Sequence, residues 1–324
     1  MIDEARAFWV VAPGRGEIRR EQLRPPSNDE VVVQTLFSGI SRGTESLVFR
    51  GLVPQSEWTR MRAPFQDGEF PGPVKYGYAS VGRVDSGPGE LKGRTVFVLH
   101  PHQTRYVVPA SAVHVLPASV PPERAVLAAN LETALNGVWD ARPHLGDRIV
   151  IIGAGVVGSL AAWLAARIPG CDVQLVDVNP QRASVAHTLG VAFAQPDAAV
   201  RDADVVIEAS GSPEGLQLGL DIAGDEATVV EMSWFGDRLV PLALGGAFHS
   251  RRLTIKSSQV GRVAPAQRTR WNTNRRMGLA LALLADPVLD VLISGESSFD
   301  ALPDVMTRLA GAPGDALCHR IRYQ

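Results

Sequence analysis

Three glycines at a fixed spacing, followed by an acidic residue, are the strongest chemical signal in the chain. Gly153, Gly155 and Gly158 follow the apolar run 148–152 and open an apolar segment with helical character. The first glycine permits a tight turn, the second lets a pyrophosphate approach the backbone, and the third allows the helix to pack against the strand. Asp177 ends the next apolar run, where a carboxylate can accept hydrogen bonds from a ribose diol. The pattern predicts a dinucleotide site, and a purely structural glycine turn is the alternative.

Further residues are expected at this ligand because of their positions after strands or at the start of the helix. Ligands bind at the carboxyl ends of parallel strands, and a helix N-terminus favours phosphate. These additional candidates are Val156, Val157, Ser210, Gly211 and Ser233. Arg182 either stacks beside an adenine or caps a helix. Asp177 would repel a 2′-phosphate, so NAD is expected as the cofactor and NADP is less favoured.

Composition narrows the class of protein. The 324 residues suit two domains, and a net charge of −2 gives no reason to expect a nucleic-acid partner. Cys171 and Cys318 are the only cysteines, too few for a four-cysteine metal site or a disulfide framework. The first residues, Met1 to Arg6, lack the apolar core of a secretory signal, and no apolar run is long enough to cross a bilayer. A soluble, cytoplasmic protein without membrane association is expected.

The order of the apolar patterns predicts the fold class. Residues 1–125 hold short apolar or alternating runs bounded by Pro, Gly and Asp, which favour strands. From residue 148 onward strand and helix patterns alternate, which favours a parallel sheet with helices on both faces. The expected strands of this part are 148–152, 173–177, 204–208 and 228–232.

With these motifs in this order, the chain resembles the medium-chain dehydrogenase/reductase superfamily over nearly its whole length. The segments that carry the resemblance are 39–45, 77–82, 146–147, 153–158 and 206–211. The resemblance implies an α/β protein in which a GroES-like, β-rich catalytic domain is interrupted by a Rossmann domain with a doubly wound parallel sheet. It assigns residues 1–129 and 252–324 to the catalytic domain and 130–251 to the Rossmann domain, with Thr133 at the nicotinamide. Segments 39–45 and 77–84 look most like the dehydrogenases that oxidise the hydroxyethyl side chain of a bacteriochlorophyllide.

The departures from the superfamily concern zinc. Ser41 stands where the zinc enzymes of the family have a cysteine, and Tyr78 stands where they have a histidine. The third ligand position falls near Ala128 or Ala129. Because a zinc site needs thiolate, imidazole or carboxylate ligands, these replacements predict an enzyme without zinc.

Without zinc, hydrogen-bond donors or a cation must stabilise the substrate oxygen during hydride transfer. Tyr78 is the first candidate, Lys75 is expected to lower the pKa of its phenol, and Ser41 and Arg42 are further donors. The alternative is that Tyr78 only fills space, with Lys75 and Arg42 solvated or paired with Glu45. His249 is a weaker catalytic candidate because it falls near the expected domain junction. The pair His100 and His102, which flanks Pro101, is expected on a surface loop.

The leading hypothesis is an NAD(H)-dependent, zinc-free oxidoreductase that acts on a secondary alcohol or ketone. The aromatic residues of loop 50–75 favour a fairly large, partly apolar small-molecule substrate. The alternatives are a zinc-free enone or quinone reductase and a non-catalytic NAD-binding sensor. The apolar run 228–232, expected to form a sheet edge with 239–244, predicts a homodimer.

Overall fold

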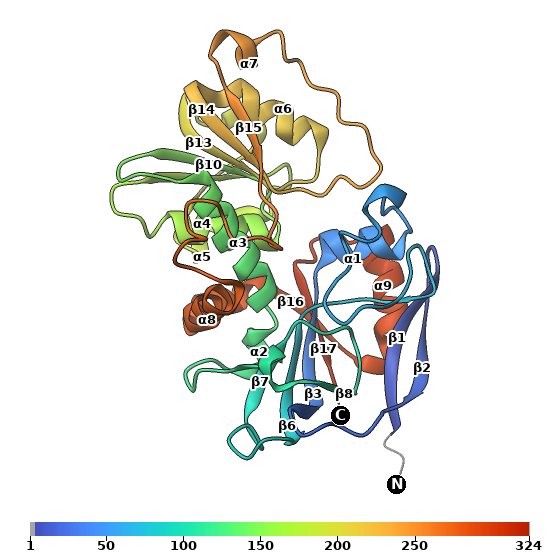
Figure 1. Ribbon diagram of the computed structural model, residues 1–324. Helices are drawn as coiled ribbons and strands as arrows, with labels where there is room; N and C mark the ends of the chain where they lie inside the picture. The colour runs from blue at the N-terminus through green and yellow to red at the C-terminus, as the bar shows by residue number, and fades with distance from the viewer. Residues whose placement is uncertain (1–3, 324) are drawn as a thin grey trace. The chain divides into compact units, whose positions relative to one another are not determined.

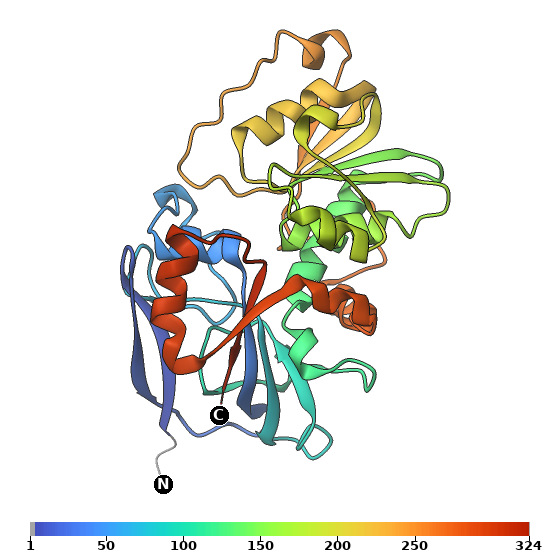
Figure 2. The ribbon, with the colours of Figure 1, turned by 180° about the vertical axis from the view of Figure 1, so that it is seen from behind.

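The computed structural model describes residues 4–323, and Figures 1 and 2 show it from opposite sides. The chain forms two compact units. The first contains the described residues up to Ala129 and those from Met277 onward, and the second contains Asn130–Arg276. Residues 1–3, part of the N-terminal segment in which no secretory signal is expected, lie outside the described residues. Within residues 4–323, no helix is both long and apolar enough to span a bilayer.

The first unit is built on two sheets. One has the strand order β2-β1-β5-β4, and the other has the order β16-β17-β3-β6-β7-β9 with β8 paired to β3. The strands of the first sheet are β1 (Glu4–Ala12), β2 (Arg15–Gln22), β4 (Asp67–Gly68) and β5 (Val74–Lys75). Those of the second are β3 (Glu30–Ile40), β6 (Ser80–Ser86), β7 (Thr95–Val98), β8 (Arg105–Pro109), β9 (His114–Val115), β16 (Ile293–Ser298) and β17 (Cys318–Arg322).

Alternating side chains give the second sheet its core. Val31 and Val33 of β3 pack with Val84 of β6, Val96 of β7 and Tyr106 of β8, all buried. Residues two apart on a strand share a face, so this alternation commits one face of the sheet to the core. The unit also contains three α-helices that lie wholly within it: α1 (Arg42–Phe49), α2 (Pro122–Ala125) and α9 (Leu302–Gly311).

The second unit is a single parallel sheet with the strand order β12-β11-β10-β13-β14-β15. Its strands are β10 (Arg148–Ile152), β11 (Asp172–Val176), β12 (Ala192–Ala194), β13 (Ala203–Glu208), β14 (Ala223–Glu231) and β15 (Thr254–Ser257). Its helices are α4 (Val156–Ala165), α5 (Arg182–Thr188), α6 (Pro213–Ile222) and α7 (Ala247–Ser250). Two more helices, α3 (Ala128–Ala141) and α8 (Thr273–Leu283), run across the unit boundaries.

Numbered from β10, this order is 3-2-1-4-5-6, the doubly wound order of dinucleotide-binding sheets. The chain leaves β10 in one direction and later returns to its other side at β13. Right-handed crossovers therefore place the helices that follow β10 and β11 on one face of the sheet and the helix that follows β13 on the other. The predicted fold class, a β-rich unit plus a Rossmann-type parallel sheet, is confirmed.

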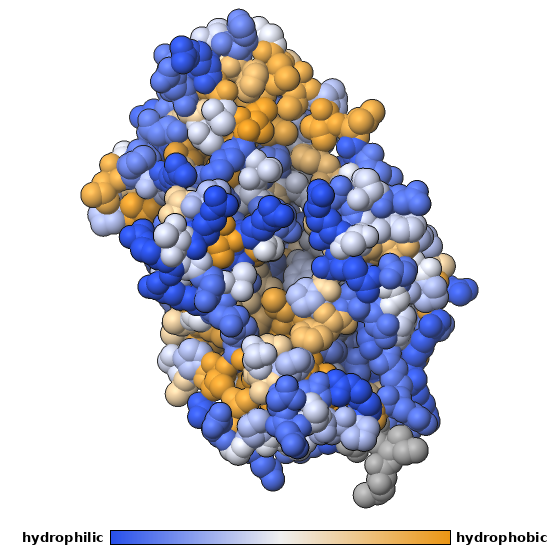
Figure 3. All heavy atoms as spheres, viewed as in Figure 1, coloured by the Kyte–Doolittle hydropathy of each residue, from blue (hydrophilic) through white to orange (hydrophobic). Residues whose placement is uncertain are grey.

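Two expectations about the end of the Rossmann part differ from the structure. Residues 252–276 belong to the second unit, because β15 extends its parallel sheet and the buried Arg276 forms an ion pair with Glu132 of α3. The run 228–232 is not a sheet edge, because β14 lies between β13 and β15. Segment 239–244 contains no strand and leaves Leu239 95% exposed. Figure 3 shows apolar side chains at the surface of this part of the second unit.

Candidate active site

The glycine turn has the geometry that the sequence pattern predicts. Gly153 has φ +99°, and a Cβ there would lie 2.6 Å from the Cα of Ser210. At Gly158 an added Cβ would lie 1.9 Å from the carbonyl oxygen of Gly153, so only glycine lets α4 begin this close to the turn. Gly155, the residue before α4, is different: a Cβ there would meet no described atom within 4 Å. Gly153 and Gly158 thus allow close packing. Gly155 borders open space, which suits the pyrophosphate of a dinucleotide.

The start of α4 is suited to a phosphate. Val156 and Val157 form its first turn and are partly exposed, and no side chain caps this end of the helix. The N–H groups of a first helical turn have no partner within the helix and attract anions. Thr133 lies on α3, and α3 packs against the segment after β14, where an added Cβ on Gly137 would touch Met232 Sδ.

Asp177 follows β11 and is partly exposed. One of its oxygens accepts a hydrogen bond from the Ala154 N–H at 2.6 Å, and the other accepts one from the Asn179 N–H at 2.8 Å. The carboxylate is therefore fixed beside the glycine turn. Arg182 is the first residue of α5 and is 6% exposed, so its side chain is part of the interior around α5.

The polar residues after β13 and β14 are joined to one another. Ser233 donates its hydroxyl to Glu208 Oε2 at 2.6 Å and accepts a hydrogen bond from the Gly211 N–H at 2.9 Å. Ser210 bonds the other Glu208 oxygen through its N–H, at 2.7 Å, and through its hydroxyl. The structure thus brings together Ser210, Gly211 and Ser233. Sequence reasoning missed Glu208, although an acid at the end of an apolar strand was a visible signal.

The first unit contains a buried hydrogen-bond network around the start of α1. Glu45 of α1 accepts a hydrogen bond from the Ser41 N–H at 2.7 Å, and its other oxygen lies 2.8 Å from His102 Nε2. His102 Nδ1 lies 2.7 Å from the Ser38 hydroxyl, which lies 2.9 Å from the hydroxyl of Tyr323. All five residues are at least nine-tenths buried. His102 is therefore a core residue, and the expectation of a surface loop is wrong.

His100, the other histidine of that pair, is also buried. Its ring stacks on the Tyr106 ring with centroids 3.6 Å apart and is contacted on its other side by Phe65. Burial lowers the pKa of His100 to about 3, so this imidazole is neutral at ordinary pH.

Tyr78 joins the network through hydroxyl groups. Burial, and next the negative charge of Glu45, raise the pKa of the Tyr78 phenol to about 12, while hydrogen bonds with the Ser41 and Thr44 side chains act in the opposite direction. The phenol is therefore protonated across the physiological range and is a hydrogen-bond donor rather than a base. Thr44 and Glu45, which sequence reasoning did not single out, are the partners that define this site.

Lys75 does not act on Tyr78 as expected. Its ammonium lies 2.8 Å from Glu21 Oε2 and 3.8 Å from Asp67 Oδ2, and it sits over the Trp9 ring. The pKa of Tyr78 is raised, and Lys75 is not among its causes. The expectation that Lys75 acidifies this phenol is wrong, because strand β5 turns the lysine toward β2 and β4 instead.

The remaining two candidates are placed differently from each other. Arg42 is the first residue of α1, next to Ser41, and is partly exposed. His249 is exposed on α7, which directly precedes β15 and therefore lies at the amino ends of the strands (Figure 1). The cofactor residues lie at the carboxyl ends. The structure thus places His249 at the opposite end of the sheet from the candidate cofactor residues, and its catalytic role stays a prediction.

The donor types around Ser41 do not suit a catalytic zinc ion. Ser41 and Tyr78 present hydroxyls, and the Glu45 and His102 side chains are hydrogen-bonded to each other. Across residues 4–323, no three His, Cys, Asp or Glu side chains converge as metal ligands would. The residues present therefore do not fit zinc.

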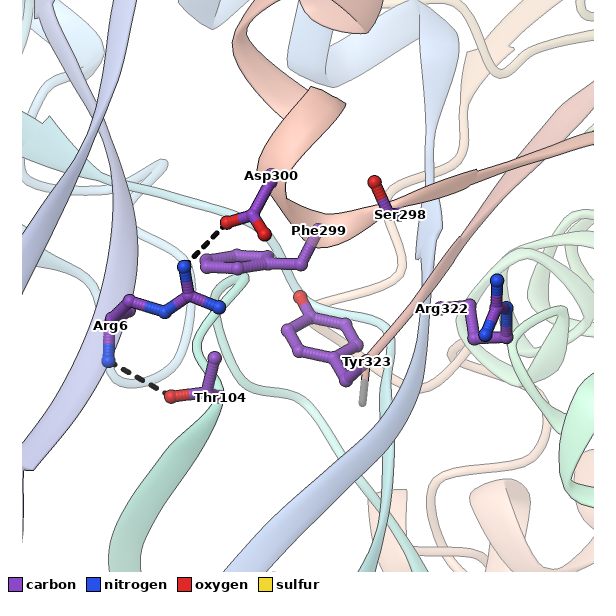
Figure 4. A pocket seen from close by; sticks show the side chains of 7 residues that line it. All are labelled: Arg6, Thr104, Ser298, Phe299, Asp300, Arg322 and Tyr323. Carbon is purple, nitrogen blue, oxygen red and sulfur yellow. Dashed lines mark hydrogen bonds and ion pairs between the residues drawn. The ribbon is translucent and has the colours of Figure 1, made fainter.

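A small pocket of about 30 Å³ lies elsewhere in the first unit (Figure 4). Arg6 bonds Asp300 at 2.5 Å across it, and Phe299 and Tyr323 form part of its wall. This volume accommodates about one water molecule, so the pocket is too small for an organic substrate.

Comparison with known proteins agrees with the fold. Residues 129–214 match the family model for the alanine dehydrogenase/PNT C-terminal domain. The curated 2-desacetyl-2-hydroxyethyl bacteriochlorophyllide A dehydrogenase of Rhodobacter capsulatus is 32% identical over 213 residues, which cover 59% of this chain and 61% of that protein. The match thus spans less than two thirds of the relative's length.

Two solved structures match nearly the whole chain. One is an alcohol dehydrogenase from Escherichia coli CFT073 complexed with NADH, with TM-score 0.78, 16% identity and coverage of 98% and 99% of the two chains. The other comes from Sinorhizobium meliloti 1021 and is bound to NADP. It is described as a zinc-binding dehydrogenase whose function is not established, with TM-score 0.79, 19% identity and 99% coverage of both chains. With the strand order and the glycine turn, these similarities show that the chain has the fold of these dehydrogenases.

Proposed function

We propose that this chain is a zinc-independent oxidoreductase that uses NAD(H) to interconvert a secondary alcohol and a ketone. The observation that carries the proposal is the hydroxyl pair Ser41 and Tyr78, which is held against the buried Glu45 at the position where zinc enzymes of the superfamily have ligands. The name of the Rhodobacter relative, a dehydrogenase of a hydroxyethyl group, supports an alcohol as the reacting function.

The cofactor would be held by the residues at the carboxyl ends of the parallel strands. When bound, NAD(H) supplies or accepts the hydride. The open backbone at Gly155 and the first turn of α4 suit its pyrophosphate, and Asp177 suits a ribose diol. Since one solved neighbour carries NADH and another NADP, the preference for NAD rests on Asp177.

Tyr78 would hold the substrate oxygen by donating a hydrogen bond from its neutral phenol. Charge develops on that oxygen during ketone reduction, and a preorganised donor stabilises it most when water is excluded. The Ser41 hydroxyl can supply a second hydrogen bond, and Arg42 can supply positive charge at the same end of α1. Fixing Ser41 through Glu45 keeps this donor set in place.

Loop 50–75 supports a fairly large, partly apolar substrate. Phe65 has 40% of its surface exposed while the face of its ring stacks on His100. Its exposed surface is available to an apolar part of a substrate. A tetrapyrrole-like substrate is supported by the likeness to the Rhodobacter enzyme, not by this loop.

Purified protein tests the proposal. It should hold NADH, contain less than stoichiometric zinc by elemental analysis, and reduce NAD⁺ with members of a panel of secondary alcohols. One tightly held zinc per chain would refute zinc independence. Turnover with enones alone would favour the reductase alternative, and NADH binding without turnover on either panel would favour a sensor. We further propose a cytoplasmic homodimer.

A further inference from the structure

Two carboxyl groups meet at the carboxyl ends of neighbouring strands in the second unit. Glu208 of β13 is the register partner of Glu231 of β14, and Glu208 is completely buried. The Oε2 atom of Glu231 is buried as well, with no hydrogen-bond partner among the described residues. Two ionised carboxylates at such a site would repel each other strongly.

The donors around the pair are unequally divided. Glu208 accepts hydrogen bonds from the Ser210 N–H, the Ser210 hydroxyl and the Ser233 hydroxyl. Glu231 accepts one from the Ser233 N–H at 2.5 Å. Within the described chain, Glu208 thus has three donors and Glu231 has one. A proton shared by the two groups lets the unpartnered oxygen of Glu231 donate a hydrogen bond to Glu208, which satisfies it.

The surroundings offer no positive charge to offset a second carboxylate. The register neighbours are Ile152 of β10 and Ser257 of β15, and α6 presents Gly215, where an added Cβ would lie 2.9 Å from Glu208 Oε1. Two basic groups on the same loops and strands have other partners: Arg238 donates to the Gly211 carbonyl, and Lys256 pairs with Asp140. Burial, followed by Glu208, raises the pKa of Glu231 to about 9.

We propose that Glu208 and Glu231 share one proton, and that this proton keeps Ser210, Gly211 and Ser233 together as a platform for the cofactor. The two serines connect both strand ends to the Glu208 carboxylate, and Ser233 also bonds the Gly211 N–H. Loss of the proton places two negative charges at this junction and separates the two loops. Glu208 and Glu231 are thus positioning residues, and the inference rests on the proposed cofactor binding.

The sign of the pH effect follows from the pair. The proton is bound below about pH 9 and lost above it. If only the protonated pair supports the platform, NADH affinity is constant near neutrality and falls up to about tenfold by pH 10, where roughly one tenth of the molecules keep the proton.

NADH fluorescence titrations between pH 7 and pH 10 test this on the wild-type chain, Glu231→Gln and Glu226→Gln. Glu226 lies on the same strand with an exposed side chain and serves as the matched control. The carboxamide of Glu231→Gln donates a hydrogen bond at every pH, so this variant should bind NADH with an affinity independent of pH. Glu226→Gln should weaken at alkaline pH like the wild type. A constant wild-type affinity up to pH 10, or an equal fall in Glu231→Gln, would overturn the proposal.

A measurement without cofactor separates this inference from the proposed function. A group whose pKa is raised in the folded state loses its stabilising effect as pH rises from its unfolded to its folded pKa. Glu231→Gln should therefore gain thermal stability relative to wild type between pH 5 and pH 9. If the wild type fails to bind NADH, the proposed cofactor is refuted, and this comparison alone decides whether the pair holds a proton. An unchanged difference in melting temperature would refute the shared proton.

Discussion

His102 Nε2 lies 2.8 Å from Glu45 Oε2, and the two side chains are 1% and 3% exposed. This contact joins the loop before β8 to α1. The Ser41 N–H bonds the other oxygen of the same carboxylate, so the contact also fixes the start of α1. The candidate donors Ser41 and Tyr78 therefore lie beside a buried polar pair that fixes the start of α1.

Removing one partner of this pair should destabilise the first unit. His102→Ala leaves an oxygen of the buried Glu45 side chain without its hydrogen-bond partner. Leaving a buried polar group unsatisfied costs about 1–3 kcal/mol. Denaturant unfolding measures the loss. His144→Ala, at a side chain that is 85% exposed, is the control and should change stability by less than about 0.5 kcal/mol. A His102→Ala protein as stable as the control would show that the pair is not a structural support.

Tyr78→Phe should lower turnover about 100-fold or more, in the range typical of losing one oxyanion donor, while NADH affinity stays unchanged. The ring remains and only the hydroxyl is removed, so packing is preserved. Tyr76→Phe is the matched control, because its ring centroid lies 6.0 Å from that of Tyr78 and its side chain is buried. With the pKa of Tyr78 at about 12, the neutral donor persists below about pH 11, and no Tyr78-dependent break in the rate should occur there. Near-normal turnover of Tyr78→Phe would transfer the role to Ser41 or Arg42.

Local patterns predicted the parts of the site that depend on backbone geometry. The glycine turn, α4 and the acid after β11 follow from short-range rules, because Gly153 and Gly158 each meet a steric demand within a few residues or one strand away. Strand β15 was missed because Thr254-Ile-Lys-Ser257 is short and mostly polar. It is a strand because β14 provides a paired neighbour.

The polar networks could not be predicted because their partners are distant in sequence. Glu45 and His102 are 57 residues apart, and Ser38 and Tyr323 are 285 apart, so no spacing rule links them.

Lys75→Met should lower stability by about 1.5–3 kcal/mol, the range for hydrogen bonds to charged groups. The change removes the cation that Glu21 and Asp67 contact on the neighbouring strands. Lys92→Met provides the comparison at an exposed lysine. Chemical denaturation gives the stability, and the pH–rate profile should keep the wild-type shape. A shifted pH–rate profile would show that Lys75 acts on the titration of the reacting groups after all.

The wild-type chain should be a dimer that depends on the apolar surface of the second unit. Leu239 is 95% exposed in the segment after β14, and β15 leaves one edge of the sheet unpaired within the described chain. Leu239→Glu should produce monomers in light scattering, whereas Leu145→Glu, at a leucine of the same unit that is 74% exposed, should remain dimeric. A wild-type monomer at micromolar concentration would contradict the expectation.

Asp177 should make the chain prefer NADH to NADPH by at least about tenfold, which corresponds to about 1.4 kcal/mol. Its carboxylate is fixed beside the glycine turn by the N–H groups of Ala154 and Asn179, and this position puts negative charge where a 2′-phosphate would lie. Asp177→Ser removes the charge and should narrow the ratio of the two affinities, mainly by strengthening NADPH binding. Asp172→Ser changes an exposed aspartate at the opposite end of β11 and should leave the ratio unchanged. Calorimetric titration of the three proteins with both cofactors measures the ratios. Equal or tighter binding of NADPH by the wild type would mean that Arg182, at the start of α5, outweighs the carboxylate.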